Sequence, residues 1–104
     1  MPPRPLEIGP AGQATAHAIE RTRTARGYSQ RRLAARVTAL GRPMTFTALS
    51  RIERTVRRCD IDDLVAIAAA LGIPPHELLT PPGGAEVGAI YPTIPGFRNR
   101  GFSG

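Results

Sequence analysis

The sequence predicts an all-α fold, a compact five-helix domain spanning about residues 12–80. Three observations support this prediction. Apolar residues recur at helical spacing throughout the span, and no run alternates apolar and polar residues as a strand would. Candidate cap residues stand at the ends of the periodic segments. Proline and glycine gather outside the span, so residues 1–11 and 81–104 are expected to be flexible N- and C-terminal arms.

The first two helices are marked by their caps and by their apolar faces. The first is predicted from Gln13 to Arg26, and Gly27 suits the left-handed position that ends a helix. The second is predicted to begin at the N-cap residue Ser29. Helical spacing places on their inner faces Ala14, Ala18, Ile19 and Thr22 in the first helix, and Leu33, Ala34 and Val37 in the second.

The remaining three helices follow an interruption at Gly41 and Pro43. Thr45 is the expected N-cap of the third helix, "FTALSRIER", whose Leu49 and Ile52 can reach the core together. The fourth starts at Asp60, where an acidic variant of the capping box is completed by Asp63, and it ends at Gly72. The fifth, in "PPHELL", has proline at its start and is expected to close the core with Leu78 and Leu79.

Positive charge is concentrated in the middle of the chain. All 14 basic residues are arginine, and residues 20–59 hold eleven of them against two glutamates, a net charge of +9. Such a concentration on a small domain is the electrostatic footprint expected of a protein that binds a phosphate backbone. The alternative is a solvated basic face without a partner.

Enzymatic and metal chemistry find little support in the sequence. Cys59 is the single cysteine, and His17 and His76 belong to no recognisable triad or metal motif. No cofactor, no metal and no enzymatic activity are therefore expected. Cys59 lies at a helix start, where a thiolate and a redox role are conceivable, but a small structural residue is the favoured interpretation. No membrane span is expected either, and a cytoplasmic location follows from the lone cysteine.

Several segments in order resemble the phage repressor and Cro-like (XRE-type) helix-turn-helix family. They are "RTRTARGYSQRRLAARV", "TALSRIER" and "DIDDLVAIAAALGIPPHELL", and together they cover about residues 16–80. The resemblance implies a lambda-repressor-like fold, binding to double-stranded DNA, and a transcriptional regulator, by default a repressor that acts as a dimer on pseudo-palindromic sites. Helix 45–54 would then be the recognition helix that enters the major groove.

The resemblance also implies roles for individual residues. The exposed positions of the recognition helix, expected to contact bases, are Phe46, Thr47, Ala48, Ser50 and Arg51. Arg51 is suited to bidentate pairing with guanine, and Thr47 offers a hydroxyl and a methyl group. Phe46 offers only apolar contact, and it is equally expected to fold back onto the preceding turn as part of a small satellite core.

Phosphate contacts are implied around this helix. Gln30 matches a residue that in the family bonds a phosphate, and the loop after the recognition helix runs beside the DNA backbone in the family. The expected phosphate contacts are Gln30, Arg31, Arg32, Arg42, Arg54, Arg57 and Arg58. Arg23 and Glu53 match an ion pair between the first and third helices, the alternative being two exposed charges that never meet.

One departure from the family lies between the second and third helices. The segment 38–44, "TALGRPM", is about five residues longer than the short turn of a helix-turn-helix. Either the second helix gains nearly a turn through Leu40, or the segment forms a loop packed under Met44. Both interpretations place Arg42 on the outside and change the angle of the recognition helix.

A protein-interaction module is the alternative function. The recognition helix lacks Asn, Gln and Lys, and the C-terminal arm holds Tyr91, Phe97 and Phe102, three of the five aromatic residues. An antitoxin-like or polymerase-binding protein would use the same scaffold and residues 81–104 to hold a protein partner. A homodimer would form through the last helices or through this arm.

Overall fold

The computed structural model of the protein describes residues 7–79. Within this range the regular elements are five helices, which confirms the predicted all-α fold. They are α1 (Pro10–Ala25), α2 (Gln30–Ala39), α3 (Phe46–Glu53), α4 (Ile61–Leu71) and α5 (Pro75–Leu79). The expectations for residues 81–104, and for the first six residues of the N-terminal arm, lie outside the described residues.

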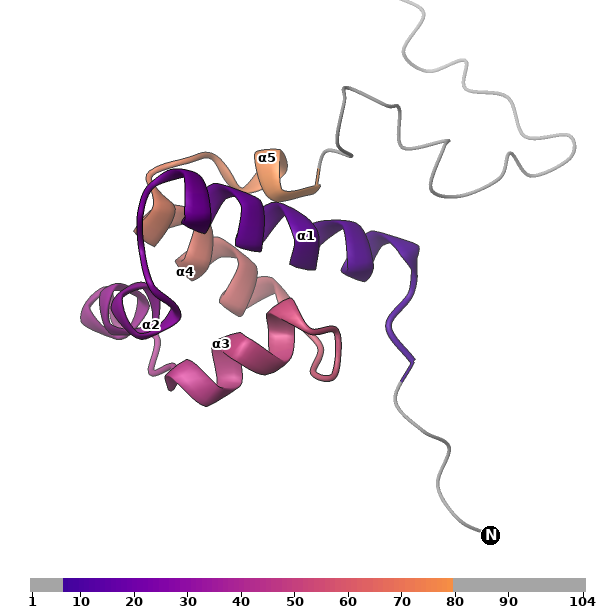
Figure 1. Ribbon diagram of the computed structural model, residues 1–104, viewed down its shortest axis with the longest axis horizontal. Coiled ribbons are helices and arrows are strands. Elements are labelled where there is room, and N and C mark those ends of the chain that lie inside the picture. The colour runs from indigo at the N-terminus through magenta and orange to yellow at the C-terminus, as the bar shows by residue number, and fades with distance from the viewer. Residues whose placement is uncertain (1–6, 80–104) are drawn as a thin grey trace, which may run out of the picture.

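The core draws side chains from all five helices. α1 packs against α5, α3 and α4, and α2 packs against α3 and α4. In Figure 1, α5 lies on one side of α1 and α3 lies on the other. The residues that are completely shielded from solvent are Ile19, Leu33, Val37, Leu49, Ile67, Ala68 and Leu78. The inner faces predicted for α2 and α3 are confirmed. In α1, Ala18 and Ile19 are buried as predicted, but Ala14 and Thr22 are only half-buried and Thr15 and Ala16 are buried in their place.

α1 begins earlier than predicted. It starts at Pro10 and not at Gln13, because Gly9 is extended (φ −71°, ψ 177°) and proline already has the φ angle that the first helical position requires. The prolines of the N-terminal arm were taken only as helix breakers. Residues 10 and 11, assigned to that arm, are therefore helical.

The predicted N-caps are confirmed. The hydroxyl of Ser29 accepts a hydrogen bond from the backbone N–H of Arg32, and the hydroxyl of Thr45 accepts one from Ala48. Asp60 and Asp63 form a reciprocal capping box at the start of α4. These caps satisfy N–H groups that have no partner inside their own helices.

Four of the helices end in the same way, with one residue in the left-handed region. For α1, α2 and α4 this residue is Gly27, Gly41 or Gly72, with φ between 74° and 105°. For α3 it is Thr55 (φ 60°), whose N–H bonds to the carbonyl of Ile52. A left-handed conformation is costly for a residue with a Cβ atom, so α3 ends on a strained residue.

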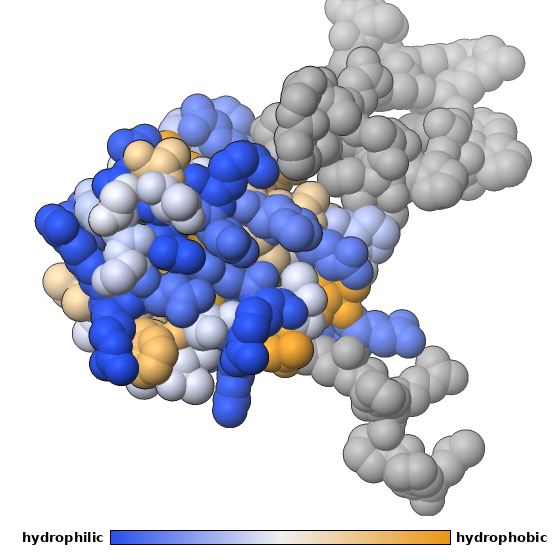
Figure 2. Space-filling model, viewed as in Figure 1, coloured by the Kyte–Doolittle hydropathy of each residue, from blue (hydrophilic) through white to orange (hydrophobic). Residues whose placement is uncertain are grey.

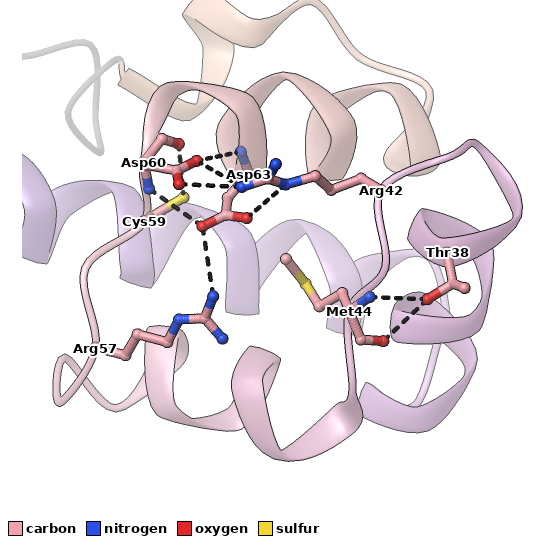
Figure 3. Close-up of polar contacts among 7 residues, drawn as sticks. All are labelled: Thr38, Arg42, Met44, Arg57, Cys59, Asp60 and Asp63. Carbon is pink, nitrogen blue, oxygen red and sulfur yellow. Dashed lines mark hydrogen bonds and ion pairs between the residues drawn. The ribbon is translucent and has the colours of Figure 1, made fainter.

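The long segment between α2 and α3 combines both of its predicted forms. α2 runs to Ala39, with Leu40 as its C-cap, and Met44 is buried beyond it. Thr38 closes the segment, since its hydroxyl both accepts from the N–H of Met44 and donates to the carbonyl of Met44, each at 3.0 Å (Figure 3). The position of α3 is thus fixed by side-chain contacts rather than by a short turn.

Leu79 corrects one prediction for the core. Its side chain is 47% exposed, whereas its neighbour Leu78 is fully buried. α5 has only five residues and turns one face inward, so adjacent leucines cannot both reach the interior.

Candidate nucleic-acid interface

α3 has a buried face and an outward face. Leu49, Ile52 and Glu53 are buried, which turns the opposite side of the helix toward solvent. Of the residues predicted to contact bases, Phe46, Thr47 and Arg51 are exposed, Ser50 is half-buried, and Ala48 is half-buried against the core. Four of the five residues therefore lie where they can face a partner, and Ala48 lies at the flank.

Phe46 lies at the start of α3 and contacts α2. The guanidinium carbon of Arg31 is 4.1 Å from the centre of the Phe46 ring, a cation–π arrangement. Phe46 is still 38% exposed and is not part of the main core cluster. The pair joins the first turns of α2 and α3 at the surface.

The other end of α3 is held by the predicted ion pair. Arg23 donates from Nε and Nη2 to the two carboxylate oxygens of Glu53, at 2.8 and 3.0 Å. The side chain of Glu53 is 2% exposed, so the alternative of two separate surface charges is wrong. Arg23 also donates from Nη1 to the carbonyl of Tyr28 at 2.8 Å. Bidentate geometry and burial make this a rigid link between α1, the α1–α2 connection and α3.

Gln30 takes part in the same network. Its side-chain amide donates to Oε1 of Glu53 at 3.1 Å. The residue expected to bond a phosphate is thus also fixed by the carboxylate that holds α3.

Tyr28 and Arg36 form a contact that sequence reasoning missed. Arg36 is exposed, and its guanidinium lies 4.9 Å from the Tyr28 ring while its Nε donates to the carbonyl of Ala70, near the end of α4. Arg32 stacks on the same ring at 5.1 Å. The carbonyls of a last helical turn lack partners within the helix, so Arg36 also caps α4. The helical spacing of Tyr28, Arg32 and Arg36 was the sequence signal that could have predicted this contact.

Arg42 lies near the N-terminus of α4. It donates from Nε to Asp63 at 3.1 Å and from Nη2 to Asp60 at 3.0 Å (Figure 3). The hydrogen bond to Asp63 raises the pKa of Arg42, and backbone hydrogen bonding from Asp63 lowers the pKa of Asp60. Its guanidinium, expected to contact phosphate, is therefore already engaged by two carboxylates.

The other arginines predicted around α3 are exposed. Hydrophilic side chains cover most of the face shown in Figure 2, and apolar ones appear on it only as small separate patches. Arg54 donates from Nε to the carbonyl of Ser50 at 3.4 Å, and Arg57 approaches Asp63 to 4.0 Å. The exposed members of the predicted phosphate set are Arg31, Arg32, Arg54, Arg57 and Arg58.

Cys59 is half-buried in the loop before α4. Burial, followed by the negative charges of Asp63 and Asp60, raises the pKa of its thiol to about 12. Partial burial and the two nearby carboxylates thus disfavour the thiolate that the helix start was thought to favour. The part of the chain from residue 7 to residue 79 has no cluster of potential metal ligands, and no helix there is long and apolar enough to cross a membrane.

Comparison with known proteins identifies the family to which the chain belongs. A family model described as Helix-turn-helix matches residues 19–78, more than half of the chain. The chain belongs to this family. The match includes α2, α3 and the whole of α4, so the predicted resemblance to the phage repressor and Cro type is confirmed.

Two solved structures are similar to this helix-turn-helix protein. One is a hypothetical transcription factor, NHTF, from Neisseria, with 25% identity and a TM-score of 0.63 over 79% of this chain and 88% of that one. The other is the restriction-modification controller protein C.AhdI from Aeromonas hydrophila, with 27% identity and a TM-score of 0.58 over 64% and 94%. A search of the curated proteins finds no match. Family and neighbours together support a DNA-binding transcriptional regulator.

Proposed function

We propose that this protein is a sequence-specific transcriptional repressor that inserts α3 into the major groove of DNA. The observation that carries the proposal is the division of α3 into two faces. Leu49, Ile52 and the ion-paired Glu53 hold one face in the domain, and Thr47 and Arg51 are exposed on the other, with Ser50 half-buried beside them. Hydroxyl and guanidinium groups are the kinds that distinguish base edges in the major groove.

The arginines around α3 supply the affinity that does not depend on base sequence. Arg31 and Arg32 lie on α2, and Arg54, Arg57 and Arg58 follow α3. Each arginine that neutralises a phosphate releases counterions and makes binding weaker at higher salt. Repression follows if the bound protein blocks access to a promoter.

Selection of binding sites from random DNA, followed by affinity measurements on the selected site, tests this proposal. Arg51→Ala should weaken binding to the selected site by about 1–3 kcal/mol and relax preference at one base pair. Arg21→Ala is the charge-matched control, because Arg21 lies on the outer face of α1 with His17 and Glu20. Failure to enrich any site, or equal losses in the two variants, would contradict the proposal.

We also propose that the DNA-bound state is a homodimer that uses α5. Leu79 gives α5 an exposed apolar side chain that two copies can bury against each other across a two-fold axis. The spacing of selected half-sites reports the dimer directly. Leu79→Glu should abolish cooperative binding to paired half-sites, whereas Val65→Glu, at a similarly exposed position of α4, should not. Equal effects of both substitutions would argue against α5.

The protein-interaction module makes an opposite set of predictions. It requires a partner held by residues 81–104 and no dependence on Arg51. Deleting these residues would then remove the partner while Arg51→Ala would leave it bound. The same two variants therefore separate the two functions.

A further inference from the structure

We propose that Asp63 is a specificity-determining residue that sets the orientation of the recognition helix by holding the chain on both sides of it. The inference rests on the proposed DNA-binding function of α3. Asp63 is in the first turn of α4, and its side chain is 3% exposed. Arg42 reaches it from the segment before α3, and Arg57 reaches it from the loop after α3 (Figure 3). We call Asp63 with these two arginines the Asp63 clamp.

The Arg42 arm of the clamp is held by two carboxylates. Its Nε bonds to Asp63 and its Nη2 bonds to Asp60, so one edge of the guanidinium is held by two carboxylates. Together with the two hydrogen bonds between Thr38 and Met44, this contact fixes where the chain enters α3. Arg42 therefore acts as a positioning residue.

The Arg57 arm is open on its outer side. Its Nη2 lies 4.0 Å from Asp63, but the side chain is 44% exposed. A guanidinium carries five donors in a rigid fork, so it can face a buried carboxylate and a DNA phosphate at the same time. A phosphate bound there would be linked through Arg57 to the carboxylate that fixes α3. Lysine, with a single ammonium group, is poorly suited to such a bridge.

The clamp connects α4 to α3 through the segments that flank α3. α3 itself packs mainly against α2 and α1, and its last residue is fixed by Arg23. Loss of the Asp63 charge leaves that packing in place but releases both flanking segments. It also frees the charge of Arg57, whereas Arg42 keeps its ion pair with Asp60. Binding to random DNA should then strengthen while discrimination between sequences weakens.

Asp63→Asn tests the clamp, with Asp62→Asn as the matched control. Both substitutions remove one negative charge from the first turn of α4, but Asp62 is exposed. Affinities for the selected site and for a random duplex are measured over a range of salt concentrations. For Asp63→Asn we expect the ratio of the selected-site affinity to the random-duplex affinity to fall about tenfold. The slope of log affinity against log salt concentration for the random duplex should steepen by about 0.9, because one phosphate contact is added. Asp62→Asn should leave the ratio and the slope unchanged. Equal ratios for the two variants would overturn the proposal.

Arg57→Lys tests the bridge without altering a buried residue. If Arg57 served only as a charge near a phosphate, lysine would preserve the affinity ratio. The bridge predicts that Arg57→Lys lowers the ratio as Arg57→Gln does, while only the glutamine variant flattens the salt slope. An unchanged ratio in Arg57→Lys would overturn this part of the inference.

Hydrogen exchange separates failure of the clamp from failure of DNA binding. In the absence of DNA, amides of residues 40–45 and 54–60 should exchange faster in Asp63→Asn than in Asp62→Asn, while amides of α1 stay protected. Faster exchange in a protein that selects no DNA site would support the clamp and contradict the proposed function. Identical exchange in both variants would overturn the clamp, whatever the protein binds.

Discussion

Arg23 and Glu53, thirty residues apart, form a bidentate ion pair in which the carboxylate is 2% exposed. Because the pair is so well shielded from water, removing one partner should change the stability of the protein much more than removing both. Glu53→Ala leaves the Arg23 charge in a partly buried site, and the expected destabilisation is about 3–5 kcal/mol. Urea unfolding followed by circular dichroism measures it.

The control for this prediction is the double variant Arg23→Met with Glu53→Met. Apolar side chains of similar size replace both charges, so its stability should approach that of the unmodified protein. A double variant as unstable as Glu53→Ala would show that the network with Gln30 and the Tyr28 carbonyl matters more than the charges.

Thr55→Gly should stabilise the protein. Thr55 occupies a left-handed conformation (φ 60°) at the end of α3, where α1, α2 and α4 have glycine. Relief of the steric cost at Cβ is expected to raise the free energy of unfolding by about 1 kcal/mol. The converse change, Gly72→Ala, meets no atom within 4 Å of the new Cβ and should cost about the same amount through backbone conformation alone. Thermal unfolding of both variants checks the pair, and a fall in stability for Thr55→Gly would contradict the prediction.

Thr38→Val should loosen the segment before α3. Valine has the shape of threonine but leaves the N–H and carbonyl of Met44 without the partner that each has at 3.0 Å. The expected loss is about 1–2 kcal/mol. Thr38→Ser keeps the hydroxyl and should lose much less. Equal losses in the two variants would contradict the assignment of the loss to the hydroxyl.

Stability should fall in acid partly through Asp60. Hydrogen bonding from the backbone of Asp63 and the charge of Arg42 hold its pKa below the ordinary value of 3.8. Because the folded-state pKa is the lower one, the stabilisation is complete above about pH 4 and is lost as the pH falls through the folded-state pKa. Unfolding between pH 2 and pH 6 should show a shallower acid limb for Asp60→Asn, which keeps the N-cap. If stability fell with pH equally steeply in Asp60→Asn and in the unmodified protein, Asp60 would not contribute to the loss of stability in acid.

Cys59 should resist alkylation. A pKa raised to about 12 leaves very little thiolate at pH 8, so iodoacetamide should modify the folded protein at least about 100-fold more slowly than a free cysteine. Mass spectrometry over time measures the rate, and the same protein in 6 M guanidinium is the control. Rapid modification of the folded protein would show that the loop before α4 opens.

The sequence predicted the helices well because helices and their caps are local. Ser29, Thr45 and the Asp60–Asp63 box each act within four residues, and glycines mark three of the helix ends. Pro10 shows the limit of local reasoning, because proline disrupts the interior of a helix but is favoured at its first position. Thr55 shows a second limit, because nothing in its side chain announces a left-handed backbone.

The site was less predictable because its contacts are distant in sequence. The partnership of Arg23 with Glu53 was inferred from family resemblance and not from spacing. Arg42 and Asp63 are 21 residues apart, and excess arginine near an acidic helix start does not say which arginine will pair. The predicted base and phosphate contacts stay predictions, and the structure shows which of their side chains are exposed.

The long connection between α2 and α3 bears on how this protein could acquire new targets. Because Glu53 and the two flanking segments anchor α3 through groups outside its outward face, that face can change without disturbing the scaffold. The residues that anchor α3 are different from the residues on its outward face. Substitutions at Thr47, Ser50 and Arg51 can therefore accumulate in a lineage, or in a designed library, with little penalty to folding.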